Sequence, residues 1–523
     1  MKSAWVVFPR LDRITCSLPN PISTPATPIS AGDGVKKGVV KFLLNTLRLG
    51  EFTAEHRVKE QEGAIARYMR PITIPKGFLQ AMRSVDSAEW QAAITTEVNN
   101  MRTMEVFDIL PLPPQQHATQ GGWAFAIKGI PGVDLRYKAS SLWLLLMIAA
   151  HEFWEVTNFD FVAAYLNPPI SKELWIKPPE GMEIPKGYGC RLQKELYGTR
   201  QAGRHWWKHL SGTLCGMGYD HSAYNLSVYV NHGAGVYIWV HVDDGIVFAR
   251  TPAALADLRH HLSQDFRIKW ADGVRSIIGL RIDHTANGYL VSQTQAIDGI
   301  IASHGADANV KSSPLSPSCQ LPTLNDNHTP VEPKRFLLVI GLLIHISSSS
   351  RPDICFAVNS LACHQKNPGD VHWRAVQHLL GYLKGWWLHG LILEPTNDQG
   401  LCTYLDESWG GEFRRSCHGY ITTMYSCPIS WASKRLFMVA ASSCHAEYMA
   451  LSLATRHALW KQLLLENLAL TKLVVKLHCD NASCIKICRD SGSSKQTRHS
   501  TCDFYITNQA LFENKASLEW VPS

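Results

Sequence analysis

The 523-residue sequence has no apolar run long enough to cross a membrane. Its most apolar segment, residues 142–150, ends at His151 and Glu152, whereas a membrane-spanning helix needs roughly 20 apolar residues. At the N-terminus, Pro9 and Arg10 come too early for the apolar region of a signal peptide. These absences exclude a membrane partner and predict an intracellular protein.

The sequence also has no Cys-x-x-Cys pair among its 14 cysteines. The nearest cluster, Cys479, Cys484 and Cys488, lacks zinc-finger spacing and does not favour a zinc site. Scattered cysteines without a signal peptide are typical of reduced thiols inside the cell.

Charged residues are scarce at 18%, and no internal repeat is evident. The excess of 51 Lys and Arg over 44 Asp and Glu gives a net charge of +7, which is compatible with a polyanionic partner but weak evidence for one. A hydrophobic fraction of 46% supports a sizeable core, and the length indicates about three domains.

Residues 1–75 and 312–333 are rich in proline and serine. The first segment is predicted to be a poorly ordered N-terminal linker, and the second a boundary between domains. Hydrophobic periodicity predicts the regular elements between and after these segments. They are helices at 87–104 (with Ser87 as N-cap), 162–166, 196–217, 252–266 and 446–468, strands at 123–128, 155–161, 401–406 and 473–479, and a mostly helical section at 336–393.

Asp243, Asp244 and Gly245 interrupt an apolar, β-prone run at residues 239–248. Asp-Gly between alternating apolar segments predicts a hairpin, so both carboxylates should lie at its tip. Adjacent like charges cost free energy unless a cation offsets them. A solvated turn is the plain alternative for the motif alone.

A nucleotidyl transferase needs carboxylates that hold two metal ions about 4 Å apart. Asp160 is the best partner for the hairpin because it also lies at a strand end, although it could simply cap the helix that follows. Asp406, Glu447 and Asp480 form a second set at predicted strand ends and a helix start. Taken singly, Glu447 is explained as an exposed residue at a helix start, and Asp480 as a cap of the helix that follows.

Several motifs occur in an order that resembles copia-type (Pseudoviridae-like) LTR-retrotransposon Pol polyproteins, in the portion that holds reverse transcriptase and ribonuclease H. The resemblance covers residue 87 to the C-terminus. The motifs are NFDFVAAYL (158–166), LYGTRQAGRHW (196–206), VDD (242–244), RPDI (351–354), YLKG (382–385) and SWASK (430–434).

The resemblance implies a multidomain α+β fold: a right-hand polymerase with fingers, palm and thumb, a helical connection and a C-terminal α/β ribonuclease H-like domain. The implied boundaries follow the composition of the chain. They are a linker at 1–75, reverse transcriptase fingers and palm at 76–311 with the fingers partly deleted, a linker with a helical thumb or connection at 312–398, and a C-terminally truncated ribonuclease H-like domain at 399–523.

The resemblance also implies residue roles. Asp160, Asp243 and Asp244 match the metal-binding carboxylates of the palm, and Tyr165 matches the aromatic residue that packs under the sugar. The remaining matches are Gly198 and Gln201 for nucleotide and template contact, Lys138 for the triphosphate, Asp406, Glu447 and Asp480 for a second metal set, and His499 as a candidate proton-transfer or substrate residue.

The implied cofactor is Mg²⁺ or Mn²⁺, two ions per active site. The implied partners are an RNA template, a DNA primer, an RNA–DNA hybrid and deoxynucleotide triphosphates, with a homodimer or other Pol-derived subunits as candidate protein partners. In a live element the protein would be cytoplasmic, inside virus-like particles, and/or nuclear.

The chain departs from the family in ways that bear on activity. Ser140 stands where the family has a triphosphate-binding arginine, and the fingers segment that follows is missing. His241 replaces a tyrosine, and the last ribonuclease H acid is expected just beyond Ser523. The sequence therefore supports an RNA-directed DNA polymerase with ribonuclease H. The alternatives are a catalytically decayed remnant that at most binds nucleic acid, or less favourably a protein that only cleaves hybrid RNA.

Overall fold

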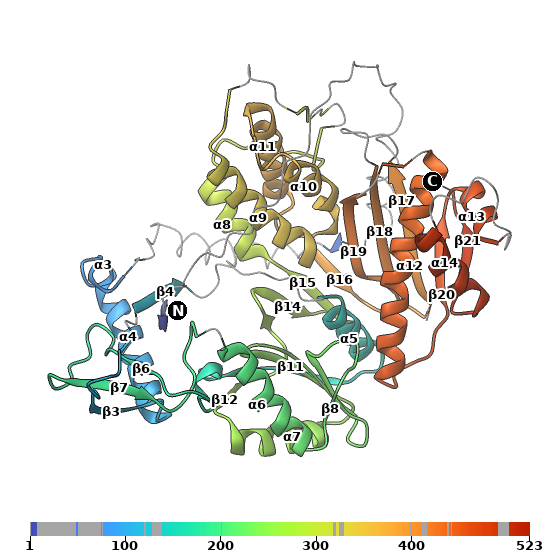
Figure 1. Cartoon of the computed structure of the whole chain (residues 1–523). Helices are drawn as coiled ribbons and strands as arrows, with labels where there is room; N and C mark the ends of the chain where they lie inside the picture. The colour runs from blue at the N-terminus through green and yellow to red at the C-terminus, as the bar shows by residue number, and fades with distance from the viewer. Residues whose placement is uncertain are drawn as a thin grey trace.

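A computed structural model gives the arrangement of the chain in space (Figure 1). The described residues are 2–7, 49–50, 75, 77–119, 122–127, 139–199, 201–316, 319, 321–323, 329–397, 400–408, 416–436, 439–440, 442–489 and 501–522. Helices and sheets alternate in several distinct layers, which confirms the multidomain α+β class.

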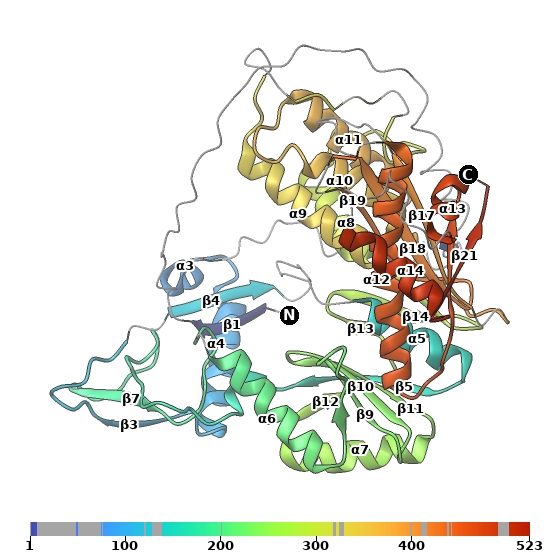
Figure 2. The same cartoon turned by 45° about the vertical axis from the view of Figure 1, so that its right-hand side comes forward.

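The first part of the described chain forms a small unit at the left of Figures 1 and 2. A three-stranded sheet in the order β3-β7-β6 lies beside its helices, and β1 pairs antiparallel with β4. The elements are α3 (Phe78–Met82), α4 (Ser87–Thr103), β1 (Lys2–Val7), β3 (Phe107–Pro111), β4 (Gly122–Ile127), β6 (Trp175–Ile176) and β7 (Tyr188–Leu192).

The central sheet has six strands in the order β12-β5-β11-β10-β9-β8, and each neighbouring pair is antiparallel. Its strands are β5 (Glu155–Phe161), β8 (Asp220–His221), β9 (Val228–Asn231), β10 (Val236–His241), β11 (Asp244–Ala249) and β12 (Ile268–Trp270). The associated helices are α5 (Ala139–His151), a 3₁₀ turn η1 (Ala164–Leu166), α6 (Ala202–Gly216) and α7 (Pro252–Asp265).

Strict alternation of side chains buries both faces of this sheet. In β10, Ile238 and Val240 belong to one buried cluster with α6 and α7, whereas Tyr237 and Trp239 belong to another cluster with α5. Figure 1 shows α6 and α7 on one side of the sheet. Helix α5 is buried from Ser141 to Ala149, as expected for a helix that is apolar all round.

A second five-stranded antiparallel sheet and a helical bundle follow the central sheet. The sheet order is β13-β14-β15-β16-β2, and the bundle has its own buried cluster. The elements are β2 (Leu49–Gly50), β13 (Ser276–Ile277), β14 (Leu280–His284), β15 (Tyr289–Ser292), β16 (Gly390–Leu393), α8 (Thr294–His304), α9 (Pro333–Ser349), η2 (Pro352–Ile354), α10 (Cys355–Ala362) and α11 (Asp370–Gly385).

The C-terminal unit is a mixed five-stranded sheet in the order β19-β18-β17-β20-β21. The first three strands pair antiparallel, whereas β17 with β20 and β20 with β21 are parallel. The elements are β17 (Leu401–Ser408), β18 (Cys417–Met424), β19 (Cys427–Arg435), α12 (Ser443–Asn467), β20 (Val475–Cys479), α13 (Ala482–Arg489), α14 (Thr501–Phe512) and β21 (Ala516–Trp520). Helix α12 connects β19 to β20 along the chain and packs against β17, β18 and β20 (Figure 1).

Hydroxyl side chains cap the N-termini of α7 and α12. The Thr251 hydroxyl accepts a hydrogen bond from the Ala254 N–H at 3.3 Å, and Pro252 occupies the first turn of α7. At α12 the Ser442 hydroxyl accepts from the His445 N–H at 3.1 Å. No helix in the described ranges is long and apolar enough to span a bilayer.

Some predicted boundaries are wrong. The helix expected from residue 196 begins at Ala202, because Gly198 in the turn before it has a φ of +90°, which no helix residue adopts. Ser87 is the first residue of α4 and Asp86 is its N-cap. The helix expected at 162–166 is a 3₁₀ turn at Ala164–Leu166, and the end of the section expected to be mostly helical is strand β16.

The hairpin was predicted correctly, but its glycine has another role. The turn residues are Val242 and Asp243, while Gly245 lies inside β11 and pairs with Phe159 of β5. A Cβ at residue 245 would collide with the Phe159 ring. Glycine is therefore required by the close approach of the ring rather than by the turn.

This close approach predicts that Gly245→Ala destabilises the protein. The added methyl must displace the Phe159 ring from a packed core, so the free energy of unfolding should fall by about 1–3 kcal/mol. Urea unfolding followed by circular dichroism measures the change.

Gly212→Ala is the matched control, because a Cβ there meets nothing within 4 Å on helix α6. That substitution should stabilise the protein by up to about 1 kcal/mol. Equal stability of Gly245→Ala and the wild type would contradict the role assigned to the Phe159 ring.

Candidate functional site

The hairpin between β10 and β11 presents two aspartates at one edge of the central sheet. His241 pairs with Asp244, which leaves Val242 and Asp243 as the connecting residues. Val242 has a φ of +57°, an unfavourable value for a β-branched residue. The indole Nε1 of Trp206 in α6 donates a hydrogen bond to the Val242 carbonyl at 2.6 Å and so holds the turn in place.

Strand β5 brings the third aspartate to the same edge. Asp160 pairs directly with Asp244 across β5 and β11, and the Phe161 N–H donates to the Asp243 carbonyl at 2.7 Å. On the other side of β5, the exposed Lys269 of β12 pairs with Asp160. Directly opposed residues share a face of the sheet, so Asp160, Asp244 and Lys269 lie on one face.

Asp160, Asp243 and Asp244 are half-buried and share this edge, but they do not converge on a single point. Among the residues that the structure describes, the group of three Asp, Glu, His or Cys side chains with ligand atoms all within 4.8 Å of one another is Glu447, Cys479 and Asp480. The donor chemistry of the three aspartates, oxygen only, fits Mg²⁺ or Mn²⁺.

Tyr165 lies next to these aspartates in the 3₁₀ turn after β5. Its ring centroid is 4.9 Å from that of Tyr197. Burial, together with the charge of Asp243, raises the pKa of Tyr165. The phenol therefore stays neutral and forms a flat wall beside the aspartate edge.

A buried carboxyl group lies behind this wall. Burial raises the pKa of Glu97 in α4 to about 7, and a hydrogen bond with Asn100 opposes the rise. Burial and the charges of Asp243, Glu97 and Tyr165 also raise the pKa of Tyr197. Glu97 was not recognised from the sequence, since one acid on a helix carries no signal of burial.

Gln201 and Gly198 belong to the turn that leads into α6. The Gln201 amide donates to Glu195 Oε2 at 3.1 Å, and the Thr199 hydroxyl donates to the same oxygen at 2.8 Å. His205 Nδ1 lies 2.7 Å from Glu195 Oε1. The fully buried Glu195 thus organises the turn and holds Gln201.

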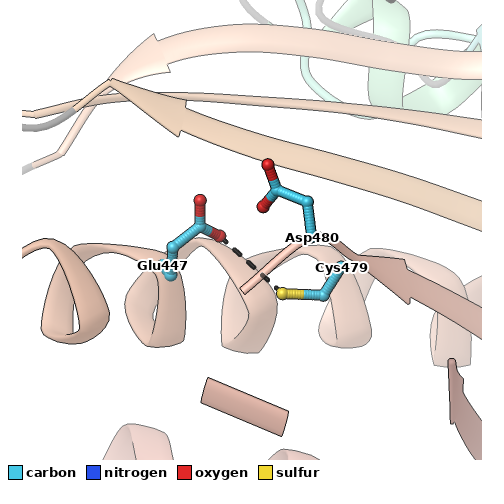
Figure 3. Close-up of side chains that lie close together, drawn as sticks. All are labelled: Glu447, Cys479 and Asp480. Carbon is cyan, nitrogen blue, oxygen red and sulfur yellow. Dashed lines mark hydrogen bonds between the residues drawn. The ribbon is translucent and has the colours of Figure 1, made fainter. Parts of the chain in front are cut away.

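The C-terminal sheet brings together a second set of acids. Strands β17 and β20 run parallel with Tyr404 opposite His478, so continuing this register by two residues sets Asp406 level with Asp480. Glu447 approaches from the first turns of α12, and Figure 3 shows it beside Cys479 and Asp480. The Cys479 thiol donates to Glu447 Oε2 across 3.9 Å.

Burial and mutual repulsion raise the pKa values of the acids in this second set. The pKa of Glu447 is raised to about 10, first by burial and then by Cys479, Asp480 and Asp406. The pKa of Asp406 rises to about 6 through burial and the charge of Asp480, and burial raises that of Asp480. A divalent cation would offset this repulsion, which fits a metal-binding role.

Two residues here were not predicted as site residues. Cys479 directly precedes Asp480 at the end of β20. Its position next to a predicted site residue was the sequence feature that could have identified it. Glu407 follows Asp406, and burial raises its pKa to about 7. The predicted Lys138 and His499 lie outside the described residues.

Comparisons with known proteins find similarity to reverse transcriptases and to retrotransposon Pol polyproteins. A family model described as "Reverse transcriptase (RNA-dependent DNA polymerase)" matches residues 135–317. The chain is 28% identical over 468 residues to the retrovirus-related Pol polyprotein from transposon RE1 of Arabidopsis thaliana, covering 82% of this chain and 32% of that protein. It is 25% identical over 466 residues to that from transposon TNT 1-94 of Nicotiana tabacum, covering 81% and 35%.

The chain thus spans about a third of the length of these relatives. Among solved structures, a foamy viral protease-reverse transcriptase in complex with dsDNA is similar at 14% identity and a TM-score of 0.45. The alignment covers 95% of this chain and 99% of that one.

The raised pKa of Glu97 predicts how stability depends on pH. The folded-state pKa of about 7 exceeds the ordinary value of 4.5. The free energy of unfolding should therefore be highest below the ordinary value and fall as the pH rises to about 7, by up to about 3 kcal/mol.

Glu97→Gln keeps the shape and the hydrogen-bonding capacity of the side chain but cannot ionise. Urea unfolding of both proteins between about pH 4 and pH 8 isolates the effect of Glu97, because every other acid titrates in both. If the wild type and Glu97→Gln gave parallel curves of stability against pH, ionisation of Glu97 would cost no free energy in the folded protein and the prediction would be wrong.

Proposed function

The chain belongs to the Pol polyproteins of copia-type retrotransposons and carries their reverse transcriptase domain, and from this premise we propose that it is an RNA-directed DNA polymerase with an attached ribonuclease H activity. The pairing of Asp160 with Asp244, with Asp243 in the adjoining turn, is the observation that carries the proposal. It supports the proposal because nucleotidyl transfer requires several carboxylates close to one another.

In this proposal Asp160, Asp243 and Asp244 hold two divalent cations. Bound there, such ions supply Lewis acidity for attack of a primer hydroxyl on a nucleotide α-phosphate. The backbone hydrogen bonds between β5 and the turn, and the Trp206 bond to Val242, hold the carboxylates in place. Tyr165, whose ring lies tilted against that of Tyr197, forms the wall against which a deoxyribose would pack.

We assign Asp406, Glu447 and Asp480 to cleavage of RNA in an RNA–DNA hybrid. They come from the ends of two parallel strands and from the helix that crosses them. Their raised pKa values show the electrostatic cost of gathering them, which a divalent cation would offset.

The partners in this proposal are an RNA template, a DNA primer and deoxynucleotide triphosphates. The net charge of +7 suits polyanions, and the similar foamy viral enzyme is in complex with dsDNA. Gly198, Gln201 and Lys138 remain proposed contacts to nucleotide and template, and His499 remains a proposed proton-transfer or substrate residue.

A second candidate function is nucleic-acid binding without catalysis. The observation that favours it is the start of α5 at Ala139, directly after Lys138, so that α5 takes up Ser140. Because Ser140 already belongs to α5, no residues are left at this point to form the fingers segment that the family carries. In addition, serine cannot replace an arginine that binds a triphosphate through two hydrogen bonds.

Primer extension on an RNA template with Mg²⁺ or Mn²⁺ tests the polymerase. We expect extension by the wild type and a loss of about 100-fold or more in Asp244→Asn, because removing one metal-binding carboxylate costs several kcal/mol of transition-state stabilisation.

Asp257→Asn is the matched control, since Asp257 is an exposed aspartate on α7 of the same unit, and it should extend primers at the wild-type rate. A folded wild type that binds the hybrid without extending it would reject the polymerase in favour of the second candidate.

Cleavage of the RNA strand in a labelled hybrid tests the other centre. Asp406→Asn should abolish cleavage and retain primer extension, whereas Asp244→Asn should do the reverse, because the carboxylates lie on separate sheets. Loss of both activities in either variant would contradict two independent centres.

A further inference from the structure

Glu447, Cys479 and Asp480 form a mixed sulfur and oxygen cluster within the C-terminal unit. One ligand atom from each side chain lies within 4.8 Å of the others, and Figure 3 shows the three side chains directed toward one another. Glu447 lies on α12, whereas Cys479 ends β20 and Asp480 follows it. Packed secondary structure rather than a loose loop holds Glu447 and Cys479.

The Cys479 thiol is placed for coordination rather than for packing alone. It is fully buried, yet its sulfur faces the Glu447 carboxylate at 3.9 Å. Cys484 contributes a hydrogen bond to the same sulfur, and Asn481 fixes Cys484 by accepting its backbone N–H at 3.0 Å. The sulfur therefore lies between a carboxylate and a polar neighbour.

Glu447 is 5% exposed and has acids for neighbours. A buried carboxylate is stable when a cation or strong hydrogen bonds offset its charge. An S–H donor at 3.9 Å is a weak hydrogen bond. The buried carboxyl group thus lacks strong compensation from this thiol, and Figure 3 shows it beside the sulfur and the Asp480 carboxyl group.

The donor set differs from one of oxygen alone. Mg²⁺ prefers carboxylates, phosphates and water, whereas thiolate ligands select thiophilic ions. A thiolate and two carboxylates match three of the four ligands that tetrahedral Zn²⁺ adopts. Coordination also removes the thiol proton.

We propose that Glu447, Cys479 and Asp480 bind a single thiophilic divalent cation of the Zn²⁺ and Cd²⁺ class, with Cys479 as the selecting ligand. This binding does not depend on the proposed polymerase or ribonuclease activity. Glu447 and Asp480 also belong to the proposed hybrid-cleaving centre, so a bound thiophilic ion would exclude Mg²⁺ from that centre. Only this consequence depends on the proposed function.

A site made of cysteines alone is the rival assignment. Cys484 also shares a hydrogen bond with Cys488, so the three thiols could in principle bind an ion without Glu447. The two assignments differ in whether Cys484 or Glu447 is required.

Cadmium titration of the full chain, stripped of metal, separates them. Cd²⁺–thiolate coordination gives an ultraviolet charge-transfer band, and Zn²⁺ competition then reports Zn²⁺ affinity. We expect a single equivalent to produce the band in the wild type, with excess Mg²⁺ unable to remove it. Cys479→Ser should lose the band, and Glu447→Gln should keep it with affinity lowered by more than about tenfold.

Cys484→Ser is the control that should retain the band and most of the affinity. Circular dichroism of each variant verifies its fold, and Asp480→Asn, at a less buried position, provides a further ligand variant that should also weaken binding. No band in the folded wild type, or an unchanged band in Cys479→Ser, would overturn the proposal. A band lost in folded Cys484→Ser but unaffected by Glu447→Gln would overturn it in favour of the cysteine site.

Discussion

The register between β5, β11 and β10 is the constraint on which the candidate centre depends. Both faces of these strands are buried, so alternate side chains belong to different clusters. A slip of one residue would send each set to the wrong face. The Phe159 ring against Gly245 adds a steric requirement to this register, and the same register brings Asp160 opposite Asp244.

Helix α5 joins the central sheet to the C-terminal unit. Its residues share one buried cluster with strands of both, and His151 at its end stacks on Tyr425 at 4.1 Å. The end of α12 contacts the central unit again, where the Ser222 hydroxyl donates to Asn467 Oδ1 at 2.7 Å. Helix α5 is therefore part of a core that the central sheet and the C-terminal unit share.

The two groups of acids, on the central sheet and in the C-terminal unit, differ in how deeply they are buried. Asp160, Asp243 and Asp244 are half-buried, so water reaches them. Glu447 is buried near Asp406 and Asp480, and the pKa values of these three groups are raised. The second centre consequently depends more on a bound cation. The Cys479 sulfur at its margin gives it a preference that the first centre lacks.

The sequence by itself determined the elements and the acids at their ends. Apolar, β-prone runs marked β5, β10 and β11, and the Asp-Gly step marked the hairpin, because these signals are local. The tertiary structure decided what depends on contacts between distant segments: the Asp160–Asp244 register, the Phe159 ring that requires Gly245, the burial of Glu97 and the approach of Cys479 to Glu447. No local pattern encodes such contacts, since burial and charge proximity arise only when the sheets and helices pack together.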